Sequence, residues 1–357
     1  MRRNSLKGKR VLLADMLFNT SLVNVFSRFF EHNKLVILNY HRIRSASIQL
    51  PTSFDDGVFN VMEDVFFQQM KWLKRHSRIL SEEEIIDEIV TNSCSVKEQK
   101  VPLVAITFDD GYLDNYSTAF PILKSLQIPA FFFICTEMIW ERKLRWWDIL
   151  AYLIKSCKKP FIVINDTEYL IQDNRQLMIA DFQLQLKFYP VEYIQKYIQL
   201  ISDACEIDLP SNDLQDRELM TQDQIREMAE HLMTIGSHTH THQALSSLDD
   251  RLRQTELTVS KQLLEQATGQ PVKSVSYPFG RYQYVPLSIQ NAVRKCGYQL
   301  GFTSSSGVNY LNEIHPMVLN RFPGFLDRIS TVSLITAWPE LFAIKEESSQ
   351  FHKLFLT

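Results

Sequence analysis

Two adjacent carboxylates, Asp109 and Asp110, stand at the end of an apolar, β-prone run that begins at Val104. A run of this length fits a buried strand of a parallel sheet, and such sheets place their ligand sites at the carboxyl ends of strands. Two like charges side by side repel each other, so a fold normally keeps them where a cation lies nearby. The pair therefore predicts a cation site, and a metal ion is the simplest candidate.

A histidine-rich segment supplies the imidazoles that such a metal would need. His238 and His242 are four residues apart and follow a short strand-like run, so both rings can lie on one side of a turn. Two imidazoles and one carboxylate, here Asp110, suit Zn²⁺ or another divalent first-row metal and leave a position for water. Asp109 is then placed to accept a proton from that water. His240 is expected to face solvent or to support the ligands from outside.

Each motif alone has a simpler explanation. A histidine-rich stretch is often a surface loop, and Asp-Asp-Gly is often a turn. The four letters Phe-Asp-Asp-Gly occur both at 54–57 and at 108–111, but no strand precedes the first copy and a helical pattern follows it. We therefore interpret 54–57 as a helix cap and 108–111 as part of the site, because only the second copy combines a strand with the distant histidines.

Strand and helix patterns alternate along most of the chain. Strand-like runs at 35–38, 104–108 and 130–134 are separated by amphipathic helical patterns, which is typical of a parallel sheet built from βαβ units. Residues 138–222 differ, because they are rich in aromatic residues, carry helical patterns and contain no strong chemical motif. We expect them to form a mostly helical insertion over one face of the sheet.

The bulk composition excludes several classes of protein. The chain has 357 residues, 45% of them hydrophobic, which is enough for a sizeable core. Its formal net charge of −3 gives no overall attraction to nucleic acid. The five cysteines include no Cys-x-x-Cys pair, and their odd number argues against a disulfide framework and for a reducing compartment. No stretch approaches the roughly 20 apolar residues of a transmembrane helix.

The N-terminal segment, residues 1–33, has basic residues followed by an interrupted apolar pattern. Polar residues such as Asp15 and Asn19 break the run, so it has no signal-peptide core, and we expect a cytoplasmic protein. Residues 10–31 fit an amphipathic helix that packs on the core. The alternative is a helix that lies on an anionic membrane surface and makes the protein membrane-associated.

With these residues in place, the chain resembles the polysaccharide deacetylases with the NodB homology domain, carbohydrate esterase family 4. Thr107–Gly111 is similar to the family's first motif, and His238–His242 is similar to its second, His-Ser/Thr-x-x-His. Tyr277–Gly280 resembles the third motif. The resemblance covers roughly 35–136 and 222–325.

The resemblance implies an α/β fold, an irregular (β/α) barrel of about seven strands. This barrel would occupy 34–330, interrupted by the insertion at 138–222 and followed by a C-terminal tail at 331–357. The resemblance also implies hydrolysis of an N-acetyl group from an amino sugar of a polysaccharide or glycan precursor, with release of acetate. Aromatic residues of the insertion then either pack a core, which we favour, or line a groove for sugar rings. A related hydrolase with another acyl substrate, and a saccharide-binding homologue without turnover, remain alternatives.

The family's residue roles can be carried onto this sequence. They make Asp109 the general base, and the backbone N–H of Phe279 a donor to the oxyanion. Tyr277 is a candidate for substrate contact. The implied ligands of the divalent metal, expected to be Zn²⁺, are Asp110, His238 and His242.

Two departures from the family pattern concern the partner of the base and the general acid. The third motif normally has an arginine two residues before its proline, where this chain has Ser276. Arg281 or Arg321 would replace it, and we favour Arg321 because it ends a strand-like run. No Leu-x-His motif appears late in the chain. Leu38–Arg42 instead resembles the start of the biofilm poly-N-acetylglucosamine deacetylases, in which the motif order is permuted, and this implies that His41 is the general acid.

Overall fold

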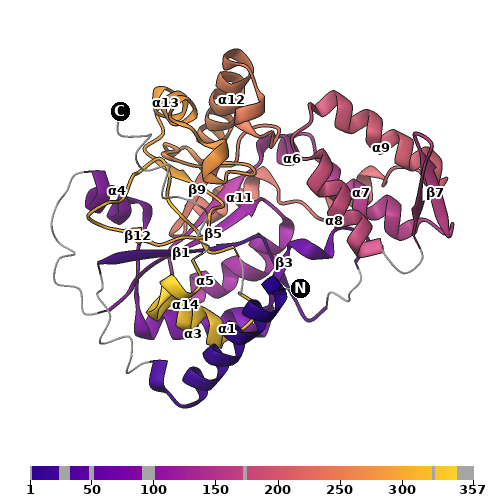
Figure 1. The fold of residues 1–357 in the computed structure, drawn as a ribbon. Helices are drawn as coiled ribbons and strands as arrows, with labels where there is room; N and C mark the ends of the chain where they lie inside the picture. Colours follow the sequence, from indigo (N-terminus) through magenta and orange to yellow (C-terminus); the bar gives the residue numbers. More distant parts are fainter. Residues whose placement is uncertain are drawn as a thin grey trace.

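A mainly parallel, curled sheet forms the centre of the protein, with helices packed around it (Figure 1). The computed structural model describes residues 2–23, 33–47, 52–90, 101–171, 175–323 and 326–343. The strands of the sheet are β1 (Lys34–Tyr40), β4 (Arg78–Ile79), β5 (Leu103–Asp110), β6 (Ala130–Ile134), β9 (Met233–Ser237), β10 (Ser274–Ser276), β11 (Leu300–Phe302) and β12 (Asn309–Tyr310). Their order is β11-β10-β9-β6-β5-β1-β12, and β4 pairs with β5 outside this path. The predicted α/β fold, an irregular barrel with about seven strands in its main path, is confirmed.

β5 and β6 lie at the centre of the sheet, and every residue of both strands is buried. Apolar side chains fill both faces of these strands, as expected of a parallel sheet that is covered on both sides. Phe108 stacks on Phe132 with ring centroids 4.6 Å apart. β1 runs parallel to β5 with Asn39 opposite Thr107. The carboxyl ends of the two strands therefore meet at one edge of the sheet.

The helices that cover the sheet follow the predicted amphipathic patterns. α4 (Glu82–Val90) begins with a capping box, in which the Ser81 N–H donates to the Glu84 carboxylate over 2.9 Å and the Glu84 N–H donates to Oγ of Ser81 over 3.3 Å. These helices are α3 (Glu63–His76), α4 (Glu82–Val90), α5 (Phe120–Leu126), α11 (Gln222–Ala229), α12 (Asp250–Thr268) and α13 (Leu287–Lys295).

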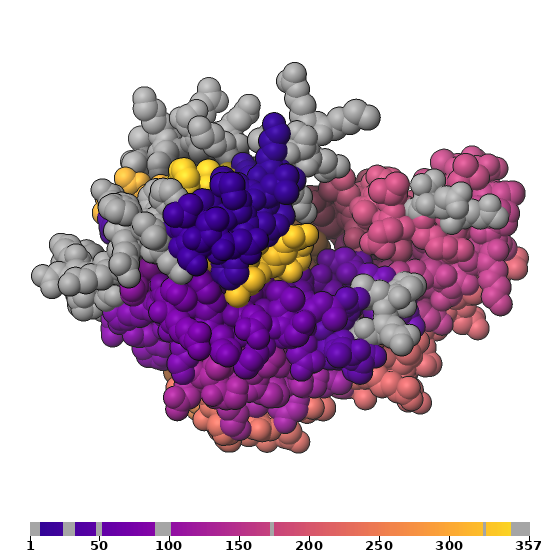
Figure 2. All heavy atoms as spheres, turned by 90° about the horizontal axis from the view of Figure 1, so that it is seen from below, coloured from indigo at the N-terminus to yellow at the C-terminus, as the bar shows by residue number. Residues whose placement is uncertain are grey.

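The N-terminal helix α1 (Arg2–Asn19) packs beside α14 (Ile329–Ala337), which in turn packs on α3. Figure 2 shows α1 at the surface, with part of α14 visible next to it. Ala14 and Leu17 of α1 are buried in the main core. The amphipathic helix was expected at 10–31, whereas α1 ends at Asn19; the last part of that expected range, residues 24–31, lies outside the described residues. No helix in the described ranges is both long and apolar enough to cross a membrane.

Residues 331–337, expected to begin a C-terminal tail, instead form most of α14. All residues from Ser330 to Ala337 are buried. The reason is that α14 lies between α1 and α3 and has neighbours on both sides. Residues 344–357 lie outside the described residues.

The insertion leaves the sheet after β6 and returns before β9, and it projects to one side of the barrel (Figure 1). Its helices α7, α8 and α9 enclose a hydrophobic cluster of their own around Phe182 and Ile201. A short hairpin adds to the expected helices because Asn165 and Asp166 both take a positive φ, as in a type I′ turn. The elements are α6 (Thr136–Trp140), α7 (Trp146–Ser156), β7 (Phe161–Ile164), β8 (Thr167–Leu170), α8 (Arg175–Leu186), α9 (Val191–Cys205) and α10 (Asn212–Asp216).

Candidate active site

The carboxyl ends of β1, β5 and β9 bring the predicted polar residues to one place. Asp109 and Asp110 are the last residues of β5, His41 follows β1, and His238 follows β9. Parallel pairing of β5 with β6, and of β6 with β9, aligns these strand ends. The two aspartates, His238 and His242 are all buried. Buried polar and charged side chains are stable only when they are paired with an opposite charge or hydrogen-bonded.

Asp110, His238 and His242 form a compact cluster of three potential ligands. One ligand atom of each lies within 4.8 Å of those of the other two. The Nε2 atoms of the two histidines are 3.1 Å apart. Oδ1 of Asp110 lies 3.5 Å from Nε2 of His238 and 3.4 Å from Nε2 of His242. Three electron-pair donors thus converge on one point.

The hydrogen bonding of His238 shows that this donor set fits a metal ion. Nδ1 of His238 lies 2.8 Å from the carbonyl oxygen of Ser276. A carbonyl oxygen only accepts, so Nδ1 carries the proton and Nε2 presents its lone pair to Asp110 and His242. Burial lowers the pKa of His238 to about 4, which keeps the ring neutral, as a ligand must be. A divalent cation would satisfy lone pairs that otherwise face one another.

The backbone at the end of β5 separates the directions of the two aspartates. Asp110 has a φ of 83° and Gly111 a φ of 103°. Glycine adopts this left-handed region freely, whereas for aspartate it is strained and typical of functional sites. As a result Asp110 faces the histidines and Asp109 faces Arg321.

Asp109 is held by a two-pronged arginine contact. Arg321 donates from Nη1 to Oδ1 and from Nη2 to Oδ2 of Asp109, each over 2.8 Å, and only 1% of Arg321 is exposed. Burial alone would raise the pKa of Asp109, but the charge of Arg321 and its hydrogen bonds outweigh burial and hold this pKa well below its usual range. Asp109 is therefore ionised at neutral pH, the state that a proton acceptor needs.

Arg321 also explains why Ser276 can stand where the family motif normally has an arginine. Nη2 of Arg321 donates to Oγ of Ser276 over 2.9 Å. The short serine side chain leaves room for a guanidinium that arrives from a later part of the chain. Arg281, the other candidate from the sequence, is exposed at the surface. Of the two arginines, Arg321 is the one that contacts Asp109.

Two residues that sequence reasoning left unassigned complete this arrangement. Nδ2 of Asn39 donates to Asp109 over 3.2 Å, and Oδ1 of Asn39 accepts from Arg321 over 2.8 Å. The Thr107 hydroxyl donates to the same Oδ1 over 2.9 Å. Both residues lie within the quoted motifs. In the sequence, each of these polar residues stands near the end of an apolar strand. That pattern alone does not show that the two residues meet, because their pairing depends on the register of the two strands.

His41 lies beside the two aspartates at the rim of the site. Its electrostatic influence reaches both Asp109 and Asp110. Nδ2 of Asn115 donates to the His41 carbonyl over 2.7 Å, which fixes the backbone there. His41 is only partly buried, unlike His238 and the other ligand candidates.

The segment after β10 brings one predicted residue to the site and turns another away. The Phe279 ring centroid lies 5.1 Å from that of His242, and no partner of the Phe279 backbone N–H is found within the described ranges. Tyr277 is buried, and its hydroxyl donates to the carbonyl of Met317 over 2.9 Å. The structure does not bring the Tyr277 side chain to the cluster, so we do not carry the expected substrate contact further.

Two further residues support the histidine segment and were not singled out in the sequence. Glu256 of α12 accepts from the backbone N–H groups of His240 and Thr241, over 2.9 and 2.8 Å. The ring of Trp147 lies 4.6 Å from that of His242, so the insertion contributes a wall of the site. Nδ1 of His240 pairs instead with the Thr136 hydroxyl at 2.9 Å, outside the ligand cluster.

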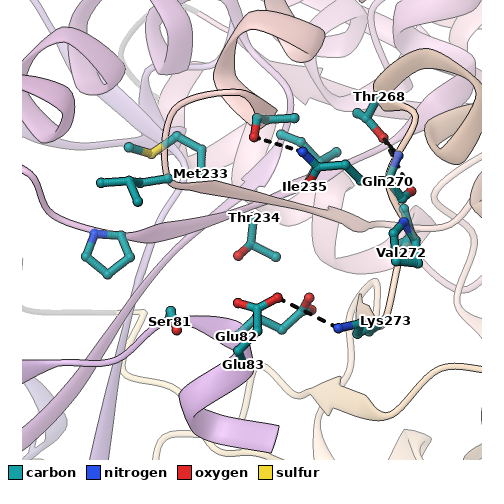
Figure 3. A pocket seen from close by; sticks show the side chains of 14 residues that line it. Ser81, Glu82, Glu83, Met233, Thr234, Ile235, Thr268, Gln270, Val272 and Lys273 are labelled. Atoms are coloured by element: carbon teal, nitrogen blue, oxygen red, sulfur yellow. Dashed lines mark hydrogen bonds and ion pairs between the residues drawn. The ribbon is translucent and has the colours of Figure 1, made fainter.

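A cavity of about 190 Å³ lies at the opposite edge of the sheet, near the amino ends of β6, β9 and β10 (Figure 3). The buried Glu82 accepts from the Ser274 hydroxyl there, and burial raises the pKa of Glu82 to about 7. Nζ of Lys273 lies 3.7 Å from Glu83. None of the predicted site residues lines this cavity, and it offers no convergent set of lone pairs. We place the chemistry at the carboxyl edge instead.

Residues 96–301 match the family model described as polysaccharide deacetylase. YxkH of Bacillus subtilis (strain 168) is 26% identical over 279 residues, which are 77% of this chain and 66% of that protein. A poly-beta-1,6-N-acetyl-D-glucosamine N-deacetylase of Staphylococcus aureus (strain MSSA476) is 31% identical over 131 residues, 34% of this chain and 43% of that protein. The chain thus spans about two thirds of the first relative and less than half of the second.

Solved structures share the fold at low sequence identity. The Streptococcus pyogenes deacetylase PplD in complex with acetate has a TM-score of 0.56 and 21% identity, over 86% of this chain and 99% of that one. IcaB from Ammonifex degensii has a TM-score of 0.53 and 20% identity, over 85% of this chain and 97% of that one.

Proposed function

Because the chain belongs to the polysaccharide deacetylase family, we propose that it is a metal-dependent N-deacetylase of an amino-sugar residue in a polysaccharide or glycan precursor. The observation that carries the proposal is the contrast between neighbouring carboxylates. Asp109 is ion-paired with Arg321, whereas Asp110 faces two imidazoles. The first carboxylate is prepared to take a proton and the second to bind a metal.

The residues proposed to hold the metal are Asp110, His238 and His242, and Zn²⁺ suits this donor set. A bound divalent ion supplies Lewis acidity, which polarises an amide carbonyl and makes water more acidic. The hydrogen bond from His238 to the Ser276 carbonyl fixes the required tautomer. Trp147 packs on His242 and limits access of bulk water from the side of the insertion.

The remaining residues supply proton transfer and charge stabilisation. Asp109, kept ionised by Arg321, takes a proton from water as the water oxygen bonds to the amide carbon. The backbone N–H of Phe279 donates to the developing oxyanion. His41 gives a proton to the nitrogen as the C–N bond breaks, so that acetate and a free amine leave. The partly buried position of His41, near enough to both aspartates to influence their charge, supports this role.

Acetate release from oligomers of N-acetylglucosamine tests the proposal. The name of the Staphylococcus aureus relative makes β-1,6-linked oligomers the first substrate to try. We expect acetate from the purified protein, loss of activity after metal removal with a chelator, and recovery on addition of Zn²⁺. Acetate release that persists when elemental analysis finds no metal would overturn metal dependence. Turnover of other acyl amides or esters alone would favour the related hydrolase, and binding without turnover the saccharide-binding homologue.

We also propose that α1 makes a peripheral contact with a membrane, and the exposed apolar residues on its outer face favour this. Leu12 and Met16 are 70% and 55% exposed, one helical turn apart, while Ala14 and Leu17 face the core. An apolar pair beside a basic segment suits an anionic bilayer surface. Flotation with vesicles that contain phosphatidylglycerol should decrease in the double variant Leu12→Ser/Met16→Ser. Equal flotation of wild type and variant would remove the proposal and leave the predicted cytoplasmic location.

A further inference from the structure

A row of aromatic rings leads from the candidate active site onto the insertion. Phe279, whose ring lies 5.1 Å from His242, is followed by Phe188 with ring centroids 6.1 Å apart. Phe188 also packs on Tyr284 at 4.5 Å. Phe188 comes from the loop between α8 and α9, whereas Phe279 and Tyr284 come from the barrel. The row therefore crosses from one unit to the other.

A second set of rings begins at Tyr189, the residue after Phe188, and extends onto α9. Tyr189 and Tyr193 stack at 4.4 Å with 21° between their planes, and Tyr193 and Tyr197 lie 6.2 Å apart at the same angle. Tyr193 and Tyr197 are four residues apart and lie on one face of α9, whereas Tyr189 precedes the helix. Tyr197 is anchored on Phe182 of the insertion core, with centroids 5.8 Å apart. The three rings are therefore held in a fixed, nearly parallel arrangement.

Core packing does not explain the outer two rings. Tyr189 is 48% exposed and Tyr193 is 43% exposed. Adjacent large aromatic faces in water are unfavourable and usually mark a binding surface. A tyrosine offers a rigid apolar face and a polar hydroxyl, which suits the apolar faces and hydroxyl groups of a sugar ring.

Two cationic side chains lie where the row begins. Nζ of Lys187 lies 5.1 Å from the centroid of the Phe188 ring. Burial and the nearby charge of Arg281 lower the pKa of Lys187. Within the described part of the chain, neither cation forms an ion pair with a carboxylate. Their N–H groups can donate to acceptor oxygens of a ligand that lies on the rings.

We propose that, in a substrate of several sugar units, the units next to the one in the active site lie across Phe188 onto Tyr189 and Tyr193. This inference rests on the proposed deacetylase function and adds the path that the substrate takes over the insertion. Lys187 and Arg281 would bind oxygens of the unit nearest the metal centre. The insertion is thus the part of the protein that selects a polymer over a single sugar.

Chain-length dependence tests the proposal. The probes are β-1,6- and β-1,4-linked N-acetylglucosamine oligomers of one, two, four and six units, compared in wild type and in Tyr189→Ser/Tyr193→Ser. For the hexamer we expect kcat/KM to fall about tenfold, mostly through KM, because two ring contacts are lost. For the monomer we expect no change. Tyr189→Phe/Tyr193→Phe keeps the rings and should restore hexamer turnover.

Val163→Ser is the matched control, because Val163 is 52% exposed on β7 at the far side of the insertion. It should leave all lengths unchanged. An equal loss for monomer and hexamer, or no loss for either, overturns the proposal while the deacetylase function stands. If the wild-type protein releases no acetate from any oligomer, the proposed deacetylase function is wrong. Calorimetry with the hexamer then tests the binding path separately. Absence of hexamer binding, or equal binding to wild type and to Tyr189→Ser/Tyr193→Ser, would overturn the proposed path.

Discussion

The same four residues, Phe-Asp-Asp-Gly, occur at 54–57 and at 108–111 and take unlike structures. At 108–111 they end the buried strand β5, and the backbone passes through positive φ at Asp110 and Gly111. At 54–57 they start a short 3-10 helix, Asp56–Val58. There the Asp55 side chain accepts from the Gly57 N–H over 2.8 Å as an ordinary cap.

The two copies differ most in where the opposing positive charge comes from. At 54–57, Asp56 accepts from Nζ of Lys155 over 2.7 Å, and Asp55 accepts from Gln183 of the insertion over 2.8 Å. At 108–111, Arg321 neutralises Asp109, but Asp110 faces only imidazoles, and burial keeps that of His238 neutral. In both copies one carboxylate has a cation. The other carboxylate accepts hydrogen bonds from N–H donors at Asp55, whereas Asp110 faces two imidazoles, so only the copy at 108–111 offers a candidate metal site.

Removal of the Asp109 charge is the strongest test of this contrast. Asp109→Asn should lower kcat by about 10³-fold, because general-base catalysis commonly contributes 10²- to 10⁴-fold, and should leave bound metal unchanged. Acetate release and elemental analysis measure both. Asp55→Asn, the matched change in the other copy, should stay close to wild type. Similar losses in both variants would show that the copies do not differ in function.

Asp110 and Asp56, the second aspartates of the two copies, should differ in their effect on metal binding. Asp110→Asn removes a proposed ligand and should weaken Zn²⁺ binding by about 100-fold or more, since even loss of residues that only support ligands costs 10- to 100-fold. Asp56→Asn should retain wild-type affinity. Competition with a chromophoric chelator measures both constants. Wild-type affinity in Asp110→Asn would remove the ligand assignment.

A histidine accompanies only the copy at 108–111. His41→Ala should lower kcat by about 10²-fold through loss of the proton donor, with metal content unchanged. His240→Ala, a nearby histidine outside the ligand cluster, serves as the control. An unchanged kcat in His41→Ala would assign the proton donation elsewhere.

The copy at 54–57 should matter for stability rather than for turnover. Asp55→Ala removes the cap and the contact with Gln183, and should lower the free energy of unfolding by about 1 kcal/mol. Chemical denaturation measures the loss. Activity per folded molecule should remain as in wild type. A selective loss of kcat without a change in stability would contradict the structural assignment.

The smallest effect concerns Asp148, which joins the two regions. It accepts from the Tyr112 hydroxyl over 2.7 Å and from the Asp55 N–H over 3.3 Å. Burial raises the pKa of Asp148 to about 7, so the folded protein keeps a proton that the unfolded chain loses above its lower pKa.

The Asp148 contribution to stability is therefore present at acidic pH and is lost as pH rises from about 4 to about 7. Asp148→Asn cannot ionise and should remove this slope. Melting temperatures at pH 5 and pH 8 measure this slope. We expect the melting temperature of Asp148→Asn, relative to wild type, to be higher at pH 8 than at pH 5. The same difference between the two proteins at both pH values would contradict the raised pKa of Asp148.

The strand context and the spacing of the histidines predicted the fold and most of the site. Apolar periodicity identifies β5, and the placement of sites at strand ends then groups Asp109 with distant histidines. The strand-like run that ends at Arg321 favoured this arginine over Arg281. The contact with Asp109 itself could not be derived from the sequence, because it depends on how the last strands return beside β1. Nor could the sequence show that Tyr277 points away, since the Pro-aromatic motif fixes the backbone and not the direction of that side chain.

The path of the insertion was the least predictable part. Its aromatic residues fit both a core and a binding groove, and the structure divides them, with Phe182 inside and Tyr189 outside. The contact of Trp147 with His242 depends on how two units dock, and no local pattern encodes it. Interactions within one element can be inferred from periodicity, whereas interactions between units need the assembled fold.

The contact between Asp109 and Arg321 has a consequence for biosynthesis. It spans 212 positions of the chain, and the contact of Asn39 with Arg321 spans 282. While the ribosome is still translating the stretch between them, Asp109 has no guanidinium to pair with, and an unpaired buried carboxylate is strongly destabilising. We therefore expect the barrel to gain its full stability only once Arg321 has been synthesised. A product that ends before Arg321 would leave Asp109 without this cation and should be less stable than the full chain.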